Sequence, residues 1–347
     1  REVSKDPATF SNAGGIRPDS GPIPMMIDMD DPQHWARRKL VNRGFTPRRV
    51  RDREAEIRSV CDGIIDKVCE QGECDFVWDI AAPLPLIMIG NDLGVEPKDR
   101  DQLLEWSDAM LSALTGDPEV MDRAAGAFVG YTEYAMRVIG ERKAEASDDL
   151  MSILCHAEVD GEKLDDDSLI HESLLILIGG DETTRHVISG GAWQLLANPD
   201  QWQLLQDDRS KLDSGIEEML RWVTPIKNMA RTATKDVELH GQQVHEGDTL
   251  LLLYGSANRD EEVFVDPHRF DVERTPNDHV AFGFGSHFCL GNSLARLELK
   301  VMFEHLLDRL PDLALVDDAE PAYRAANFVS GYESMPVRFT PTARVGT

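Results

Sequence analysis

The 347-residue sequence predicts a single, mainly α-helical domain with small β-sheets. The segment from Asp166 to Ala197 is expected to form one long helix. Its centre, Leu174–Ile178, is apolar on every side, which is typical of a central, buried helix. Strand-like segments occupy only about 230–256 and recur after 320. Because no Pro- or Ser-rich linker divides the chain, we expect one domain over residues 1–347.

Helix start signals support this fold class. Asp31-Pro32 is expected to open a helix that ends at Val41, and Thr46 is expected to cap a helix that begins at Pro47 and runs to about Glu70. Apolar residues recur at helical spacing in the second of these segments. The first 30 residues, rich in Gly, Pro and Met, are expected to form loops. The other expected helices are 82–93, 98–114, 118–144, two short helices up to Val223, and 291–309.

Composition excludes several classes of protein. The formal charge is 36 − 63 = −27, which disfavours binding to nucleic acid or to an anionic membrane. The five cysteines are odd in number and contain no C-x-x-C pair, so neither a disulfide framework nor a zinc site is expected. No apolar run is long enough to span a bilayer and no signal peptide is visible, so a cytoplasmic protein is expected. The start at Arg1 indicates that an N-terminal part is missing.

The strongest motif is the loop from Phe282 to Gly291, which fits F-x-x-G-x-x-x-C-x-G around Cys289. Gly283 and Gly285 allow a sharp turn and a close backbone approach to a flat ligand. Cys289 precedes a helix N-terminus, whose free N–H groups stabilise a thiolate. This loop resembles the haem-binding loop of the cytochromes P450.

The resemblance implies a haem-thiolate monooxygenase. Haem b would be the cofactor, with Cys289 as its axial iron ligand and Phe282, Gly285 and Gly291 shaping the loop. O2 would be the co-substrate. Electrons from NAD(P)H would arrive through a ferredoxin reductase and a ferredoxin.

Two further motifs resemble those of the same family. Glu218 and Arg221 fit E-x-x-R about 70 residues before Cys289, and with Arg269 they would form a buried network beneath the haem loop. The segment 179–184, GGDETT, resembles the oxygen-activation motif. It places charges and glycines in an apolar helix, where both destabilise the fold. The resemblance implies that Glu182 and Thr183 deliver protons during oxygen activation.

Positive charge is expected in two places: at the haem propionates and at the surface where a ferredoxin would dock. By resemblance, the haem propionates would be bound by four side chains: His34, Arg38, Arg231 and His287. Because the protein is acidic, an acidic ferredoxin would need a local basic patch on the Cys289 side. The candidates are Arg37, Lys39, Arg43 and Arg48.

Within the family, four stretches resemble the actinobacterial cholesterol side-chain oxidases: 10–18, 24–32, 178–186 and 326–331. This implies hydroxylation of the terminal side-chain methyl (carbon 26) of cholesterol or cholest-4-en-3-one, continued to the acid, in cholesterol catabolism. Apolar, Met-rich segments would line the substrate cavity. The expected lining residues are Met25, Met26, Ile27, Ile176, Gly180, Ile226, Met229, Phe328 and Val329.

Other functions remain open at this point. The protein could hydroxylate another lipid, such as a fatty acid or a different steroid, and Lys227 could then bind a carboxylate. A peroxide-driven hydroxylase usually lacks the acid–alcohol pair, and a haem-thiolate sensor or electron carrier would not need it. A haem-free helical binding protein would leave the Cys289 loop unexplained. We expect a monomer.

Overall fold

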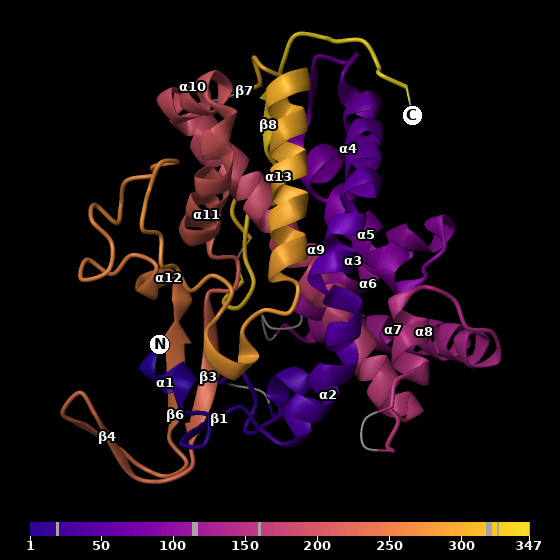
Figure 1. Ribbon diagram of the computed structural model, residues 1–347, viewed down its shortest axis with the longest axis vertical. Coiled ribbons are helices and arrows are strands. Elements are labelled where there is room, and N and C mark those ends of the chain that lie inside the picture. Colours follow the sequence, from indigo (N-terminus) through magenta and orange to yellow (C-terminus); the bar gives the residue numbers. More distant parts are fainter. Residues whose placement is uncertain (19–20, 113–116, 159–160, 317–320, 325, 347) are drawn as a thin grey trace.

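The structure is a computed structural model that describes residues 1–18, 21–112, 117–158, 161–316, 321–324 and 326–346. Figure 1 shows most of the helices gathered on one side of the molecule, and one group of strands with long loops on the other. The predicted fold class, mainly α with small β-sheets, is confirmed.

The predicted helices occur in the expected order, whereas α1, α8 and α12 were not predicted, and residues 113–114, the expected end of the helix 98–114, lie outside the described residues. Their bounds are α1 (Glu2–Lys5), α2 (Gln33–Val41), α3 (Pro47–Asp52), α4 (Glu54–Val68), α5 (Pro83–Leu93), α6 (Arg100–Ser112), α7 (Pro118–Ala144), α8 (Leu150–His156), α9 (Asp166–Ala197), α10 (Pro199–Asp207), α11 (Leu212–Val223), α12 (Tyr254–Ala257) and α13 (Asn292–Arg309). Short 3-10 turns include η1 (Met26–Asp28) and η7 (Gly285–His287), and η3 (Phe76–Ala81) is a π-helical turn.

Helix α9 is the central element, as the sequence predicted. It packs against α5, α7, α11 and α13, and buried residues occur on all of its faces. Asp165 caps its first turn by accepting a hydrogen bond from Ser168 N at 2.8 Å. A helix enclosed in this way can hold polar side chains away from bulk water, which is the property that the site uses.

Two predictions about elements were wrong. The helix expected over 47–70 breaks at Arg53 into α3 and α4, although Thr46 caps α3 as predicted by accepting from Arg49 N. The first 30 residues are not all loop: they include α1, β1 (Phe10–Ser11) and η1. Strand β1 exists because it pairs with a strand more than 200 residues later, and local sequence carries no signal for such a contact.

The strands form three small antiparallel sheets. One has the order β1–β3–β6, with β3 (Asn228–Ala233) paired to β6 (Thr249–Leu253). A second has the order β2–β8–β7, and the third is the hairpin β4–β5. The remaining bounds are β2 (Glu73–Asp75), β4 (Val237–Leu239), β5 (Gln242–Val244), β7 (Ala314–Leu315) and β8 (Pro336–Arg338).

Contrary to the expectation that no apolar run is long enough, one stretch, Phe76–Leu93, has the length and apolar character of a membrane-spanning helix. It comprises η3 and α5, and 72% of it is buried inside the protein. Its side chains belong to the two large clusters of buried apolar residues that pack against α9. Within the described residues, the apolar stretch is therefore accounted for by the core.

Candidate active site

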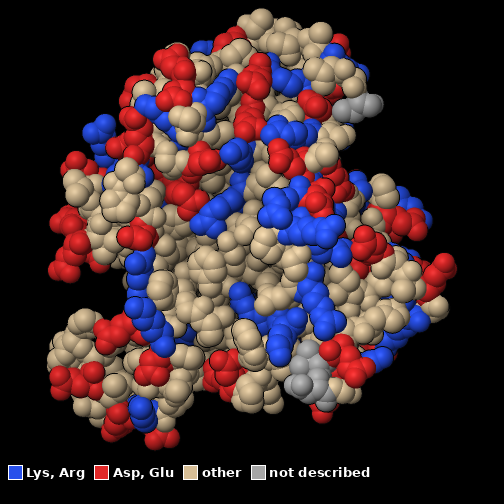
Figure 2. All heavy atoms as spheres, viewed as in Figure 1, with Lys and Arg blue, Asp and Glu red and all other residues tan. Residues whose placement is uncertain are grey.

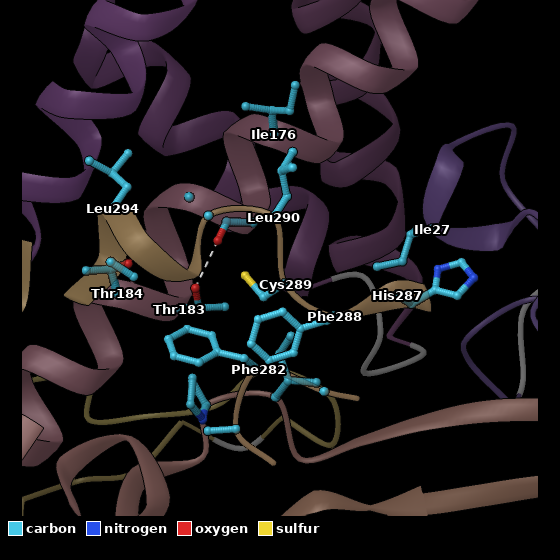
Figure 3. A pocket seen from close by; sticks show the side chains of 18 of the residues that line it. Ile27, Ile176, Thr183, Thr184, Phe282, His287, Phe288, Cys289, Leu290 and Leu294 are labelled. Atoms are coloured by element: carbon cyan, nitrogen blue, oxygen red, sulfur yellow. Dashed lines mark hydrogen bonds between the residues drawn. The ribbon is translucent and has the colours of Figure 1, made fainter. Parts of the chain in front are cut away.

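A largely apolar cavity lies between α9, the loop 282–291 and the start of α13. Figure 3 shows Thr183 and Thr184 of α9 near Cys289, with Phe282 and Phe288 beside it. The wall of the cavity includes six residues that the sequence predicted as lining: Met26, Ile27, Ile176, Gly180, Ile226 and Met229. Segments far apart in the sequence thus converge on one space.

The loop before α13 holds Cys289 at the wall of this cavity. Cys289 N donates to Phe282 O at 2.9 Å, and the Asn292 side chain donates to Cys289 O at 2.7 Å. Gly283 and Gly285 have φ values of +72° and +80°, and a Cβ at Gly285 would lie 2.1 Å from Ser4 O. This conformation requires glycine.

Burial raises the pKa of the Cys289 thiol, while the N–H groups of Gly291 and Asn292 and the guanidinium of Arg38 lower it. Burial is the larger effect. The free thiol therefore keeps its proton, and a bound metal ion would have to displace it.

Four cationic or titratable side chains line the cavity beside the Cys289 loop: His34, Arg38, Arg231 and His287. The rings of His34 and His287 stack with centroids 3.9 Å apart. Burial and the nearby positive charges lower the pKa of His287 to about 3. Burial also lowers the pKa of Arg38 and of Arg231. Buried positive charge of this kind attracts anions: Asp31 contacts His34 at 3.2 Å, and the carboxylates of Asp28 and Asp30 act on Arg231.

Thr183 and Glu182 lie on α9 but face different surroundings. Thr183 lines the cavity, and its hydroxyl donates to Gly179 O at 2.9 Å, the bond drawn in Figure 3. Glu182 is completely buried outside the cavity wall, where it contacts Arg185 at 2.5 Å and His186 and Arg324 at 3.3 Å. The sequence predicted a neighbouring acid–alcohol pair, whereas the structure places the acid in a separate charged cluster.

The two glycines of this motif differ in role. A Cβ added to Gly180 would lie 2.9 Å from the side chain of Ile89, so this glycine allows α5 to approach α9 closely. A Cβ added to Gly179 would meet no atom within 4 Å. Both glycines line the cavity, and Gly179 is the one that leaves open space in it.

Comparison with known proteins decides the family. The cytochrome P450 family model matches residues 106–313. A steroid C26-monooxygenase of Mycobacterium tuberculosis is 57% identical over 348 aligned residues, covering 99% of this chain and 94% of the relative. A steroid C26-monooxygenase of Mycolicibacterium smegmatis is 56% identical, covering 99% and 86%. The chain belongs to the cytochrome P450 family.

A solved structure agrees. The P450 CYP109E1 of Bacillus megaterium, in complex with testosterone, superimposes with a TM-score of 0.90 at 33% identity, covering 97% of this chain and 89% of that one. As a P450 monooxygenase, the protein uses haem with a cysteine thiolate, O2 and electrons derived from NAD(P)H, as the sequence predicted.

The residues present fit a haem group. Cys289 lies at the cavity wall, where its sulphur could ligate the iron, and the described residues contain no cluster of three His, Cys, Asp or Glu side chains that could hold a metal ion instead. Arg231 is 3% exposed, and its side chain donates to Ala230 O at 2.7 Å and interacts with Tyr254. A buried guanidinium that also faces a cavity matches the carboxylate of a haem propionate.

The buried ion network exists, but its third member was predicted wrongly. Glu218 accepts two hydrogen bonds from Arg221, both at 2.7 Å, and one from Arg274 Nε at 3.0 Å. The Arg269 side chain is exposed, and this residue contributes only its backbone carbonyl, which accepts from Arg221 and Arg274. The loop 266–274 curls back, so the position five residues later reaches the carboxylate.

Three predicted lining residues lie outside the cavity wall: Met25, Phe328 and Val329. Met25 is buried in the core while its neighbour Met26 lines the cavity. Val329 forms a β-bridge with Ile226, which lines the cavity, and lies behind it. Phe328 packs near Met229 and under Arg17. Lys227 also points elsewhere, because its Nζ donates to Val223 O at 3.0 Å and to Tyr323 Oη at 2.7 Å.

Sequence reasoning missed Tyr254 and Glu298, which both line the cavity, and Asp181. Glu298 is 3% exposed, and burial, with repulsion from Asp181, raises its pKa to about 8. Burial also raises the pKa of Asp181. A signal existed for Glu298, since it follows Leu294 by four residues and precedes Val301 by three, on the apolar stripe of α13.

Proposed function

We propose that this P450 hydroxylates the terminal side-chain methyl of cholesterol or cholest-4-en-3-one and oxidises it onward to the carboxylic acid. The observation that carries the proposal is the 57% identity, over 99% of the chain, to a protein named steroid C26-monooxygenase. The apolar cavity supports it, because a long hydrocarbon is held by aliphatic and Met side chains such as Ile27, Ile176 and Met229.

The proposed roles of the chain's own residues follow from their positions. Cys289 holds the iron, and His34, Arg38, Arg231 and His287 bind the propionates. The haem, when bound, supplies the oxygen-activating chemistry. The protein has to hold the side-chain end of the substrate near the iron, because a primary C–H bond is not the most reactive one, so positioning decides the site of attack.

Thr183 is the proposed donor group within the cavity, and Glu182 is proposed to feed protons to it from behind. The hydrogen bond with Asp108 and the charges of Arg185 and Arg324 lower the pKa of Glu182 against the effect of burial, so Glu182 would pass protons on rather than store them. A proton would pass between Glu182 and Thr183 through ordered water. The hydroxyl of Thr183 is the last protein group on this route.

Electrons are proposed to come from NAD(P)H through a ferredoxin reductase and an acidic ferredoxin. Figure 2 shows Lys and Arg side chains around a hollow on the face that carries α2, α3 and α13. A second pocket, between α3, α11 and α13, is lined by Arg51, Arg296 and Lys300 together with Asp213 and Glu217. Arg296 pairs with Glu217 and Lys300 with Asp213, whereas Arg48 and Arg51 are exposed. Lys39 and Arg43 are also exposed and remain candidates for docking.

Arg37 does not belong to this proposed docking surface. Its guanidinium binds Glu172 at 2.9 Å and Ser168 Oγ at 2.9 Å, so it is committed to α9. We further propose that the chain is one P450 domain over 1–347, that it is a cytoplasmic protein, and that it works as a monomer.

The test is product analysis after incubation with cholest-4-en-3-one, a ferredoxin, its reductase and NAD(P)H. The proposal expects the 26-alcohol first and the 26-acid later, with a low- to high-spin shift when the steroid binds. Hydroxylation on the rings would contradict it. Turnover of fatty acids with no spectral response to any sterol would favour the alternative of another lipid, and no turnover at all would favour a sensor or electron carrier.

A further inference from the structure

The segment between β1 and α2 forms one side of the cavity, and its described residues, 16–18 and 21–28, are called the roof below. Within it, Met26 and Ile27 line the cavity, and both belong to η1. The backbone of Ile27 is held from one side, because the buried Asn12 side chain donates to Ile27 O at 2.8 Å. The position of η1 therefore decides where two cavity-lining side chains lie.

A single carboxylate ties η1 to the central helix. Glu172 of α9 is completely buried, and its Oε1 accepts from Met26 N at 2.8 Å and from Arg37 Nη1 at 2.9 Å. Arg37 also donates to Pro24 O at 3.2 Å and to Ser168 Oγ at 2.9 Å. One ion pair thus links the roof to both α2 and α9.

Hydrogen bonds to Asp28 hold the residues of the roof together, so we expect them to move together. Asp28 is 5% exposed and accepts from Ile16 N at 3.0 Å and from Ile23 N at 2.8 Å. These bonds lie within the described residues 16–18 and 21–28, which are also held by Asn12 and by Ala230 N, which donates to Ile16 O at 2.7 Å. The Glu172–Arg37 pair connects η1 to α2 and α9, so breaking it would loosen η1 without unfolding the segment.

The anchor lies directly behind the cavity wall. Glu172 and Ile176 are four residues apart on α9 and so share a face of the helix, and Ile176 lines the cavity. We propose that Glu172 and Arg37 are positioning residues, which fix the roof so that Met26 and Ile27 confine the substrate to one orientation. Neither residue touches the reacting atoms.

This inference deepens the proposed function, and its first test does not depend on any steroid. Hydrogen–deuterium exchange is measured for the peptide 21–30 in the haem-loaded wild type, Arg37→Met and Glu172→Gln, with Lys163→Met as the control that removes an exposed cation. Exchange at Met26 N is expected to accelerate by about tenfold or more in Arg37→Met. The effect should be smaller in Glu172→Gln, whose amide oxygen still accepts from Met26 N. Unchanged exchange in both variants would overturn the proposal.

The second test is regiochemistry. With cholest-4-en-3-one as substrate, Arg37→Met is expected to yield a smaller share of terminal-methyl product and a Kd raised by about tenfold, at normal haem content. A role in general stability alone would lower haem content and leave the product ratio unchanged. Faster exchange with an unchanged product ratio would overturn the positioning role. If the wild type itself does not oxidise the steroid, the proposed substrate fails, while the exchange result still decides whether the roof is anchored as proposed.

Discussion

The molecule buries charged side chains in two clusters that differ in how completely their hydrogen bonds are satisfied. In the Glu218 cluster, both carboxylate oxygens accept from arginines, and Arg221 also donates to Asn258 O and Pro267 O at 2.8 and 2.9 Å. In the α9 cluster, six side-chain atoms of Asp181, Glu182, Arg185 and His186 are buried without a well-aligned hydrogen bond, although Arg185 and His186 form ion pairs with Glu182.

This difference separates a structural role from a chemical one. A network in which the carboxylate and guanidinium groups are all hydrogen-bonded fixes one geometry, and here it holds the chain that leads from α11 into the Cys289 loop. The one buried atom of this cluster without a partner among the described residues is Oδ1 of Asn277, whose amide donates to Glu218. Buried polar atoms without protein partners are normally satisfied by ordered water. We therefore expect water beside Glu182, where protons have to move, and little or none beside Glu218.

The largest expected effect is at the satisfied cluster. Glu218→Ala leaves Arg221 and Arg274 as buried cations, which should reduce the free energy of unfolding by about 3–5 kcal/mol and lower haem content. Urea unfolding and the haem-to-protein ratio measure this. Normal stability and haem content in the variant would show that the network is not structural.

A matched pair of variants tests the corrected assignment. Arg274→Ala removes a donor to Glu218 and should be strongly destabilising, whereas Arg269→Ala removes an exposed side chain and should change stability by less than about 0.5 kcal/mol. The same unfolding measurement compares them. If Arg269→Ala were the more destabilising of the two variants, Arg269 would be the third member of the network, as the sequence predicted.

At the other cluster the expected effect is on chemistry. Thr183→Ala should lower product formed per NAD(P)H by at least about tenfold, because positioned proton donors typically contribute 10²–10⁴-fold. The missing reducing equivalents should appear as hydrogen peroxide, and Thr183→Ser should restore coupling. Stability and haem content should not change. Wild-type coupling in Thr183→Ala would remove Thr183 from the proton route.

A smaller effect concerns pH. The pKa of Glu298, about 8, lies above its ordinary value of 4.5, so the folded protein keeps a proton that the unfolded chain releases. The free energy of unfolding should therefore fall as the pH rises from about 4.5 to 8. Glu298→Gln should flatten this dependence, as measured by urea unfolding across that range. An equally steep dependence in the variant would assign it to other groups.

The smallest expected effect concerns electron delivery. Arg43→Gln should slow ferredoxin-dependent turnover by about twofold to fivefold at low ionic strength, since an exposed charge contributes at most about 1 kcal/mol. The difference should disappear at high salt. Lys235→Gln, which removes the same charge from a loop next to the hairpin β4–β5, is the control. If both variants slowed turnover equally, the effect would come from the change in net charge alone. Arg43 would then not belong to the docking surface.

The sequence predicted the elements with strong local signals. The bounds of α9, the Thr46 cap and the Cys289 loop follow from periodicity, capping chemistry and motif spacing, which are all local. The break at Arg53 and strand β1 depend on tertiary contacts, and the sequence gives no sign of either.

The site shows the same division. Cys289, Thr183 and the four propionate partners line the cavity, because motif positions carry them. Three outcomes depend on how a loop curls or which way a side chain turns: Arg274 takes the place of Arg269, Met25 points away from the cavity, and Arg37 binds Glu172. Residue type and spacing determine neither the conformation of a loop nor the direction of a side chain.

The most direct test of the account is the spectrum of the reduced carbon-monoxide adduct, compared between the wild type and Cys289→Ser. The position of every other group in the site is interpreted relative to a thiolate-bound iron at Cys289. We expect the wild type to show the strongly red-shifted Soret band of thiolate ligation and the variant to lose it. Retention of that band in Cys289→Ser would contradict the account.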